Sequence, residues 1–436
     1  MMTIAAIFDI GKTNKKLLCV DEAYRIVHEE SIRIPEIVDE DGDPCEDLST
    51  LTEWILSKWN ELQSRKDFLV KAINVSAYGA SFVHLDRHGK AATPLYNYLK
   101  PYPSDLSDKF YDQFGGKDKI SLETASPVLG HLNSGMQLYW LKHARPEIYE
   151  RIAVSLHLPN YLSSLFHGRY GTEITSIGCH TQLWDYRRND YHAWVKAEGL
   201  ERKMAPLVPC DHAAGVLNHS AVSGPGLHDS SSSLVPYLEQ FGEPFILLST
   251  GTWNIAMNPF NNRPLTLDQL RQDCLCYLSY KSKAVMASRL HAGHWYDEQL
   301  ARLKEHFHLS SFNDNDVEFD PNWTGLYTSM EPVDIRSLPP ASLKDGYHRI
   351  IHALVNRQLK ALELIIIGTE KYLYVDGGFS QNDVFMNLLA RKLPALRVGA
   401  AAIPQASALG AALSIHKNWN SSSKPSSLVQ LKFYDH

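Results

Sequence analysis

The sequence predicts an α/β protein of two similar domains, and two observations lead to this prediction. With 436 residues, the chain is too long for one hydrophobic core, so two domains are expected. In addition, an apolar run, a glycine loop and a second apolar run follow one another around Gly11 and again around Gly251, about half the chain apart. Such a repeat indicates two like domains that face one ligand. We place the boundary near Gly242, which gives domains of residues 1–242 and 243–436.

Composition and charge restrict the class of protein. Hydrophobic residues make up 44% and charged residues 21% of the chain, as in ordinary globular proteins. The net charge of −6 gives no electrostatic reason to expect a nucleic-acid partner. The six cysteines are scattered, and Cys274-x-Cys276 is too closely spaced for a usual zinc pair, so we expect reduced thiols. Without a signal peptide or a membrane-spanning apolar run, we expect a cytoplasmic protein with no membrane partner.

The chain begins with a predicted strand, a tight turn and a second strand. Residues Thr3–Phe8 and Leu17–Val20 are the apolar runs. Between them, Gly11 allows the backbone to approach a ligand closely, and Thr13 and Asn14 add hydrogen-bonding groups beside exposed N–H groups. A plain hairpin with a glycine turn is the alternative interpretation.

A helix and a further strand follow. Ser49 is expected to cap a helix whose apolar face carries Leu51, Trp54, Ile55, Trp59 and Leu62. Lys71–Ser76 then form a strand that leads into a loop with Tyr78, Gly79 and Ser81. Ligand contact and simple packing are equally good explanations of this loop.

The stretch from Gly224 to Ser231 combines a sharp turn with His228 and Asp229, at or near the start of a helix. A helix start favours an ionised carboxylate. Ordinary N-capping by Asp229 is the alternative to a functional role. The glycine loops elsewhere in the chain favour the functional interpretation.

The second half repeats the opening pattern and adds a third glycine loop. Phe245–Leu248 are a predicted strand, and Gly251 and Asn254 match Gly11 and Asn14. Residues 342–367 are a predicted long helix. The strand Tyr372–Val375 leads through Gly377 and Gly378 to a helix beginning near Asn382, an arrangement that suits a flat or anionic ligand. A strand at 396–398 and a helix of small residues at 404–412 follow, and we expect the tail from Asn418 to be loosely held.

Together these motifs resemble the FGGY carbohydrate kinases, in the superfamily that contains actin and the Hsp70 ATPase domain, and the resemblance runs nearly end to end. Residues 9–14 resemble the first phosphate loop, 226–229 the catalytic Gly-x-His-Asp motif, 249–253 the second phosphate loop and 376–382 the adenosine motif. The mid-domain segment 156–185 also resembles that of the family. The resemblance implies two ribonuclease H-like (actin-like ATPase) domains around a nucleotide and sugar cleft.

The resemblance also implies an ATP-dependent sugar kinase that uses Mg²⁺, and it assigns roles to individual residues. Asp229 would be the catalytic base, and Asp9 would hold the metal. Lys12 would neutralise developing charge. The residues implied to bind ATP are Gly11, Lys12, Thr13, Asn14, Gly251, Thr252, Gly377, Gly378 and Asn382. Those implied to bind the sugar are Tyr78, Gly79, Ser81, His228 and Asp229.

Within the family the chain is most similar to the L-rhamnulose and L-fuculose kinases, which implies a ketose substrate, most simply a 6-deoxy ketohexose. Three departures from the family pattern concern the sugar pocket: Ser81 replaces an Asp, Tyr98–Pro101 replace an Asp-x-Arg segment, and Gln137 replaces a Lys. The alternatives are a kinase for another ketose (xylulose- or ribulose-like) or a polyol, a non-catalytic actin-fold nucleotide- or sugar-binding protein, and a sugar-sensing regulator. A homodimer is a further expectation.

Overall fold

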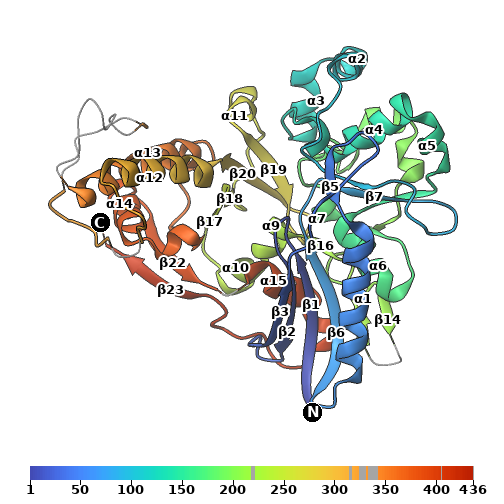
Figure 1. Cartoon of the computed structure of the whole chain (residues 1–436), viewed down its shortest axis with the longest axis horizontal. Coiled ribbons are helices and arrows are strands. Elements are labelled where there is room, and N and C mark those ends of the chain that lie inside the picture. Colours follow the sequence, from blue (N-terminus) through green and yellow to red (C-terminus); the bar gives the residue numbers. More distant parts are fainter. Residues whose placement is uncertain (218–220, 314–316, 324–329, 332–341, 404, 436) are drawn as a thin grey trace.

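The computed structural model describes residues 1–217, 221–313, 317–323, 330–331, 342–403 and 405–435. Two large sheets dominate it, and they lie on opposite sides of a central group of helices (Figure 1). No helix in the described ranges has the length and the apolar run that a membrane-spanning segment needs.

The first sheet is built from the amino-terminal half of the chain. In order across the sheet, its strands are β14 (Gly215–Leu217), β15 (Ala221–Ser223), β6 (Phe68–Ala77), β1 (Met2–Ile10), β2 (Lys15–Asp21) and β3 (Ile26–Ile32), with β16 (Leu227–His228) also paired to β6. β1 is antiparallel to β2 and parallel to β6. The predicted hairpin and the following strand are therefore confirmed.

The second sheet repeats this topology. Its strands, in order, are β19 (Cys274–Leu278), β20 (Ala284–Leu290), β18 (Asn254–Asn258), β17 (Phe245–Thr250), β21 (Tyr372–Gly377), β22 (Arg397–Ala402) and β23 (Gln430–Tyr434). β17 is antiparallel to β18 and parallel to β21, as β1 is to β2 and β6. The repeat noticed around the two glycine loops is thus a repeat of sheet topology, and the predicted two-domain α/β fold is confirmed.

Helices cover both sheets, and short strand pairs extend the amino-terminal half. The helices in chain order are α1 (Leu48–Ser64), α2 (Ser104–Phe114), α3 (Lys117–Thr124), α4 (Ser134–Ala144), α5 (Pro146–Arg151), α6 (Leu158–His167), α7 (Ile174–Ile177), α8 (Ala193–Ala197), α9 (Asp229–Ser233), α10 (Val235–Gln240), α11 (Leu267–Arg271), α12 (Ala292–His306), α13 (Leu343–Glu363), α14 (Asp383–Lys392), α15 (Ala406–Ser414) and α16 (His416–Trp419). The short strands are β4 (Ile37–Val38), β5 (Pro44–Glu46), β7 (Phe82–Leu85), β8 (Leu95–Tyr96), β9 (Val154–His157), β10 (Thr172–Glu173), β11 (Trp184–Asp185), β12 (Asp190–Tyr191) and β13 (Leu207–Val208). Within the described ranges, 3₁₀ turns span Gly130–Leu132, Leu200–Lys203 and Gly378–Gln381.

Two central helices cross between the halves. Tyr237 of α10 stacks on Tyr374 of the second sheet, and its neighbours belong to the core of that sheet. Conversely, α15 packs its small residues on the first sheet, with Ala408 and Ala411 in one core with Ile7. Each helix thus completes the core of the other half. The division near Gly242 stays a prediction, and a cut there would separate both helices from the sheets they cover.

The structure corrects two local predictions. Helix α1 begins two residues earlier than Ser49 suggests, because Asp47 is its N-cap and accepts a hydrogen bond from the Thr50 amide. The tail beyond Asn418 is not loosely held, since β23 pairs antiparallel with β22. The helix of small residues begins at Ala406, and Pro404 lies outside the described residues.

Candidate active site

The candidate site lies where parallel strands of the first sheet end. β1 and β16 flank β6 with a matched register, in which Asp9 and Leu227 both lie opposite Ser76. His228 and Asp229 directly follow. Because the carboxyl ends of parallel strands meet at one edge of a sheet, residues far apart in sequence come together there. The topology therefore brings Asp9 and Asp229 to the same edge.

Electrostatics confirms that these two carboxylates share one environment. Burial raises the pKa of Asp229 to about 6, against a weaker opposing effect of its hydrogen bonds from Ser230. Burial likewise raises the pKa of Asp9 to about 6; a hydrogen bond from Ser407 opposes the shift, and the charge of Asp229 adds to it. The Ser407 hydroxyl donates to Asp9 over 2.9 Å. Two desolvated carboxylates with raised pKa values at one edge of a sheet are typical of a functional site.

Asp229 is not the N-cap of α9. The N-cap is His228, and Asp229 is the first helical residue, whose Oδ1 accepts a hydrogen bond from the Ser230 amide over 2.6 Å. The exposed fraction of its side chain is 34%. The capping interpretation is therefore wrong in its detail, and the carboxylate remains accessible at the start of the helix.

His228 is held between both halves of the chain. Its Nε2 lies 3.3 Å from Asp229 Oδ1, and its Nδ1 lies 3.2 Å from Ser231 Oγ. The ring of Tyr277, from β19 of the second sheet, lies 5.3 Å away. Gly79 fits closely against His228, since a Cβ there would lie 3.0 Å from His228 Nε2. A side chain at position 79 would displace the imidazole.

Two tyrosine rings and a lysine ammonium group pack together beside the carboxylates. The rings of Tyr78 and Tyr98 meet edge to face at 5.9 Å, and the Lys12 ammonium lies within 6 Å of both centroids. Lys12 Nζ also donates to Glu36 at 2.7 Å and Glu46 at 2.9 Å. Although burial opposes it, these two contacts raise the pKa of Lys12. The Lys12 ammonium is thus already paired with two carboxylates. To neutralise phosphate charge as predicted, it would have to exchange these partners for phosphate oxygens.

Two departures from the family pattern adjoin one another. Gln137 donates from Nε2 to the carbonyl of Ala80, next to Ser81, over 2.8 Å, and both Gln137 and Ser81 are buried. The acidic and basic groups that the resemblance leads one to expect here are replaced together by neutral ones. Replacing both avoids leaving a single unpaired charge in the interior.

The first glycine loop is a tight hairpin. The Gly11 amide donates to the Asn14 carbonyl over 3.0 Å. Thr13 is exposed, and Asn14 accepts a hydrogen bond from Arg33 Nε over 3.0 Å. The loop follows Asp9 directly, so it faces the same edge of the sheet.

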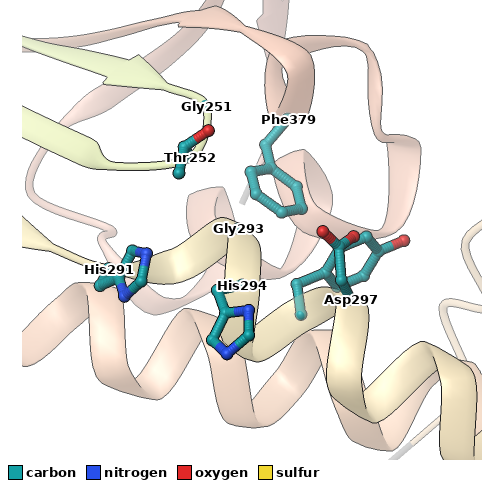
Figure 2. A pocket seen from close by; sticks show the side chains of 8 residues that line it. Gly251, Thr252, His291, Gly293, His294, Asp297 and Phe379 are labelled. Carbon is teal, nitrogen blue, oxygen red and sulfur yellow. The ribbon is translucent and has the colours of Figure 1, made fainter. Parts of the chain in front are cut away.

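The second glycine loop borders a pocket of about 540 Å³. Figure 2 shows Gly251 and Thr252 above the start of α12, with the rings of His291 and Phe379 on either side. The pocket is lined by Gly251, Thr252, His291, Gly293, His294, Tyr296, Asp297 and Phe379. Gly293 permits the close approach of the helix, since a Cβ there would lie 2.9 Å from both the Gly251 carbonyl oxygen and the Thr252 Cα. This volume is in the range of small-molecule sites.

The two glycines of the third loop differ. Gly377 has φ +79°, and a Cβ there would lie 1.9 Å from the Thr250 carbonyl oxygen, so only glycine fits. Gly378 has open space on its Cβ side. Asn382 is buried and caps α14 by accepting from the Phe385 amide, while its Nδ2 donates to Tyr347. Its side chain is therefore committed within the protein.

Several residues of this region carried no sequence signal. Gly293 and Tyr277 reach the site only because the second sheet and α12 fold beside the glycine loops. Ser407 is one of many small residues in its segment. Cys179 and His180, separated from His228 by about fifty positions, join it in a cluster that local spacing does not reveal.

The donor set suits the groups that the resemblance implies. Asp9 and Asp229 offer hard carboxylate oxygens, the ligands that Mg²⁺ prefers. Their raised pKa values show that the charge of the pair is poorly compensated in the protein alone, as expected where a cation completes the site. The pocket beside Gly251 is bordered by exposed residues of the second glycine loop.

Comparison with known sequences places this geometry in context. Residues 4–231 match the profile of the N-terminal domain of the FGGY family of carbohydrate kinases. The chain is 24% identical over 279 residues to L-fuculokinase of Escherichia coli K12, covering 58% of this chain and 56% of that protein. It is 24% identical over 262 residues to a rhamnulokinase of Halalkalibacterium halodurans, covering 56% and 52%. The chain thus spans little more than half the length of these curated relatives. An L-fuculokinase of Haemophilus influenzae aligns at 20% identity over 94% of both chains.

Solved structures share the fold. A carbohydrate kinase from Novosphingobium aromaticivorans has a TM-score of 0.80 at 22% identity, covering 100% of this chain and 94% of that one. A xylulose kinase from Lactobacillus acidophilus has a TM-score of 0.77 at 14% identity with the same coverage. At these identities the likeness concerns the fold alone.

Proposed function

Because the chain belongs to the FGGY family of carbohydrate kinases, we propose that it transfers the γ-phosphoryl group of ATP to a hydroxyl group of a ketose. The observation that carries this proposal is the pair Asp9 and Asp229, brought to one edge of the first sheet, where the Gly11 loop follows β1. Phosphoryl transfer depends mainly on positioning and on charge stabilisation, and this edge offers both.

Asp229 is the general base in this proposal. Its carboxylate accepts the proton of the attacking hydroxyl, and its raised pKa makes it a better base than an ordinary Asp near neutral pH. His228 Nε2, 3.3 Å from Asp229 Oδ1, orients that carboxylate or the sugar. Asp9 would hold Mg²⁺, which when bound neutralises phosphate charge.

The glycine loops would bind the phosphates with backbone N–H groups. Gly11 and Gly251 begin equivalent turns in the two sheets. The adenosine is assigned to the second half, near Gly378, which has open space beside it, and the pocket lined by Phe379. Thr13 and Thr252 add hydroxyl groups to their respective loops.

The sugar would lie against Tyr78, Tyr98 and His228, with Gly79 leaving room for the imidazole. A 6-deoxy ketohexose such as L-rhamnulose or L-fuculose is the proposed substrate class, since curated relatives carry those kinase names. The neutral pair Ser81 and Gln137 is consistent with an uncharged substrate. A homodimer in the cytoplasm is the proposed setting.

The test is a coupled ADP-release assay with Mg-ATP and L-rhamnulose, L-fuculose, L-ribulose, D-xylulose, glycerol and an aldonic acid. We expect the highest kcat/KM with a 6-deoxy ketohexose. Turnover only with glycerol or the aldonic acid would overturn the substrate class. Nucleotide binding without turnover of any sugar would overturn the kinase proposal in favour of a non-catalytic binding protein.

A further inference from the structure

A thiol and two imidazoles gather behind the candidate site. One ligand atom from each of Cys179, His180 and His228 lies within 4.8 Å of the others, and all three residues are buried. The two imidazole rings stand nearly perpendicular, at 89°, with centroids 6.2 Å apart. In a tetrahedral zinc site, ligand atoms lie roughly 3.3–3.6 Å apart, so closing this cluster around an ion takes a movement of only about 1 Å.

The hydrogen bonds around the cluster leave the appropriate lone pairs available. His180 Nδ1 lies 3.0 Å from the Leu132 carbonyl oxygen, so Nδ1 carries the proton and Nε2 is an acceptor. His228 Nδ1 faces the Ser231 hydroxyl. Its Nε2 faces Cys179, since a Cβ on Gly79 would lie 3.0 Å from that nitrogen and 2.7 Å from the Cys179 sulfur. A ligand histidine whose other nitrogen binds a carbonyl or hydroxyl group is the usual arrangement in metal sites.

Two charged groups lie near the cluster, the Asp229 carboxylate and the Arg289 guanidinium. Asp229 Oδ1 lies 3.3 Å from His228 Nε2 and is placed to approach an ion bound there. Arg289 of β20 also acts on His180, but it is paired with Asp273. The Cys179 thiol donates to the Ser176 carbonyl oxygen over 3.2 Å, and on binding an ion it would release this proton to solvent. Thiolate and imidazole are soft and borderline ligands that select Zn²⁺ over Mg²⁺.

We propose that Cys179, His180 and His228 form a binding site for Zn²⁺ or a similar borderline divalent cation, and that an ion there inhibits the protein. Binding occupies His228 and attracts the Asp229 carboxylate, so both groups are withdrawn from the sugar. The site itself is independent of the proposed function; the inhibition rests on it. Mg²⁺ would be held at Asp9, a carboxylate outside the cluster of Cys179, His180 and His228.

Cobalt(II) is the probe for the site, because a cysteine ligand gives it a thiolate-to-metal charge-transfer absorption. The matched control is Cys19→Ala, since Cys19 of β2 is as fully buried as Cys179 but lies in another core cluster. We expect one equivalent of Co²⁺ to bind the full chain and the Cys19→Ala variant with this absorption, and added Zn²⁺ to abolish it. In Cys179→Ala the absorption should be absent.

Thermal melts of each variant check folding. If Cys179→Ala fails to fold, His180→Gln replaces it: the absorption should persist while the Kd for Co²⁺ rises about tenfold or more, since one of three protein ligands is lost. Absence of the absorption in the wild type, its persistence in a folded Cys179→Ala protein, or an unchanged Kd in His180→Gln would overturn the site.

Inhibition is measured separately, as ADP release with saturating Mg-ATP and the best sugar, relative to each protein without zinc. We expect Zn²⁺ to lower the rate of the wild type and of Cys19→Ala at least tenfold and to spare Cys179→Ala. Equal inhibition of all three would overturn the inhibitory role. Because Co²⁺ binding requires no sugar, a protein that binds cobalt but phosphorylates nothing would refute the kinase proposal and leave the metal site standing.

Discussion

Replacing Asp229 by Asn separates catalysis from folding in one experiment. Asn keeps the Oδ1 that accepts from the Ser230 amide but cannot accept the proton of a sugar hydroxyl. Loss of general-base catalysis lowers kcat by about 10²- to 10⁴-fold. At the same time the substitution removes a charge that the folded protein solvates poorly, so we expect the variant to be more stable than the wild type.

The stability gain follows from the pKa of Asp229, which burial raises from 3.8 to about 6. At about 1.4 kcal/mol per pKa unit, the upper limit above pH 7 is about 3 kcal/mol. Since 34% of the side chain is exposed, solvent screening reduces this to about 1–2 kcal/mol. With an unfolding entropy of about 2.1 cal/mol/K per residue, the Tm rises by about 1–2 °C.

The pH dependence of this gain has a definite sign. Between pH 4 and 6 the folded wild type binds more protons at Asp229 than the unfolded chain does, so its stability falls as pH rises through this window. The advantage of Asp229→Asn is therefore largest at pH 7.5 and shrinks to about a third at pH 4.5. The assays are thermal melts of the metal-free proteins at both pH values and kcat with the best sugar. A variant that melts below the wild type at pH 7.5 refutes the desolvation argument. One that keeps more than about a tenth of kcat refutes the base assignment.

Three further predictions concern the loops and the pH profile. Gly378→Val should fold normally, because the space beside its Cβ is open, but the new side chain should weaken ATP binding at least about tenfold. By contrast, Gly377→Val should fail to fold, because its Cβ would collide with the Thr250 carbonyl oxygen. Unchanged ATP affinity, measured by calorimetry in a folded Gly378→Val protein, would contradict the adenosine assignment. Lys100 is paired with three aspartates of the 39–43 loop at 2.6–3.0 Å, so Lys100→Met should lose about 3 kcal/mol of stability; a variant that melts like the wild type would contradict this. For the wild type, kcat/KM should fall as pH is lowered through about 6, because the base becomes protonated; a profile flat down to pH 5 would exclude Asp229 as the titrating base.

The predicted fold is correct where apolar runs and glycines along the chain correspond directly to the strands and turns that form. The runs around Gly11 and Gly251 form equivalent hairpins, and the run before Gly377 forms the strand parallel to β17. The errors arose where two candidates compete within a few residues. Asp47 and Ser49 are both residue types that cap helices. Asp47 is the N-cap of α1, because its carboxylate accepts a hydrogen bond from the Thr50 amide. The tail after Asn418 lacks strong periodicity, and only the unpaired edge of β22 makes β23 a strand.

The candidate site was predictable as a set of motifs but not as an arrangement. The sequence identified Asp9 and Asp229 separately, Asp9 at the end of an apolar run and Asp229 after a sharp turn at a helix start. Nothing local indicated that the charge of Asp229 would help to raise the pKa of Asp9. Lys12 illustrates the same limit, because its partners Glu36 and Glu46 come from a loop and a short strand that the sequence did not single out.

The sequence by itself determined the repeated strand–glycine–strand units and the loop that carries Asp229, because apolar periodicity and glycine act on neighbouring residues along the chain. Tertiary structure alone decided that α15 would cover the first sheet and α10 the second, that Ser407 would donate to Asp9, and that Cys179 and His180 would meet His228. The physical reason is that these contacts join segments separated by tens to hundreds of residues. Their energies depend on the register of parallel strands and on burial, and neither is encoded in any short stretch of the chain.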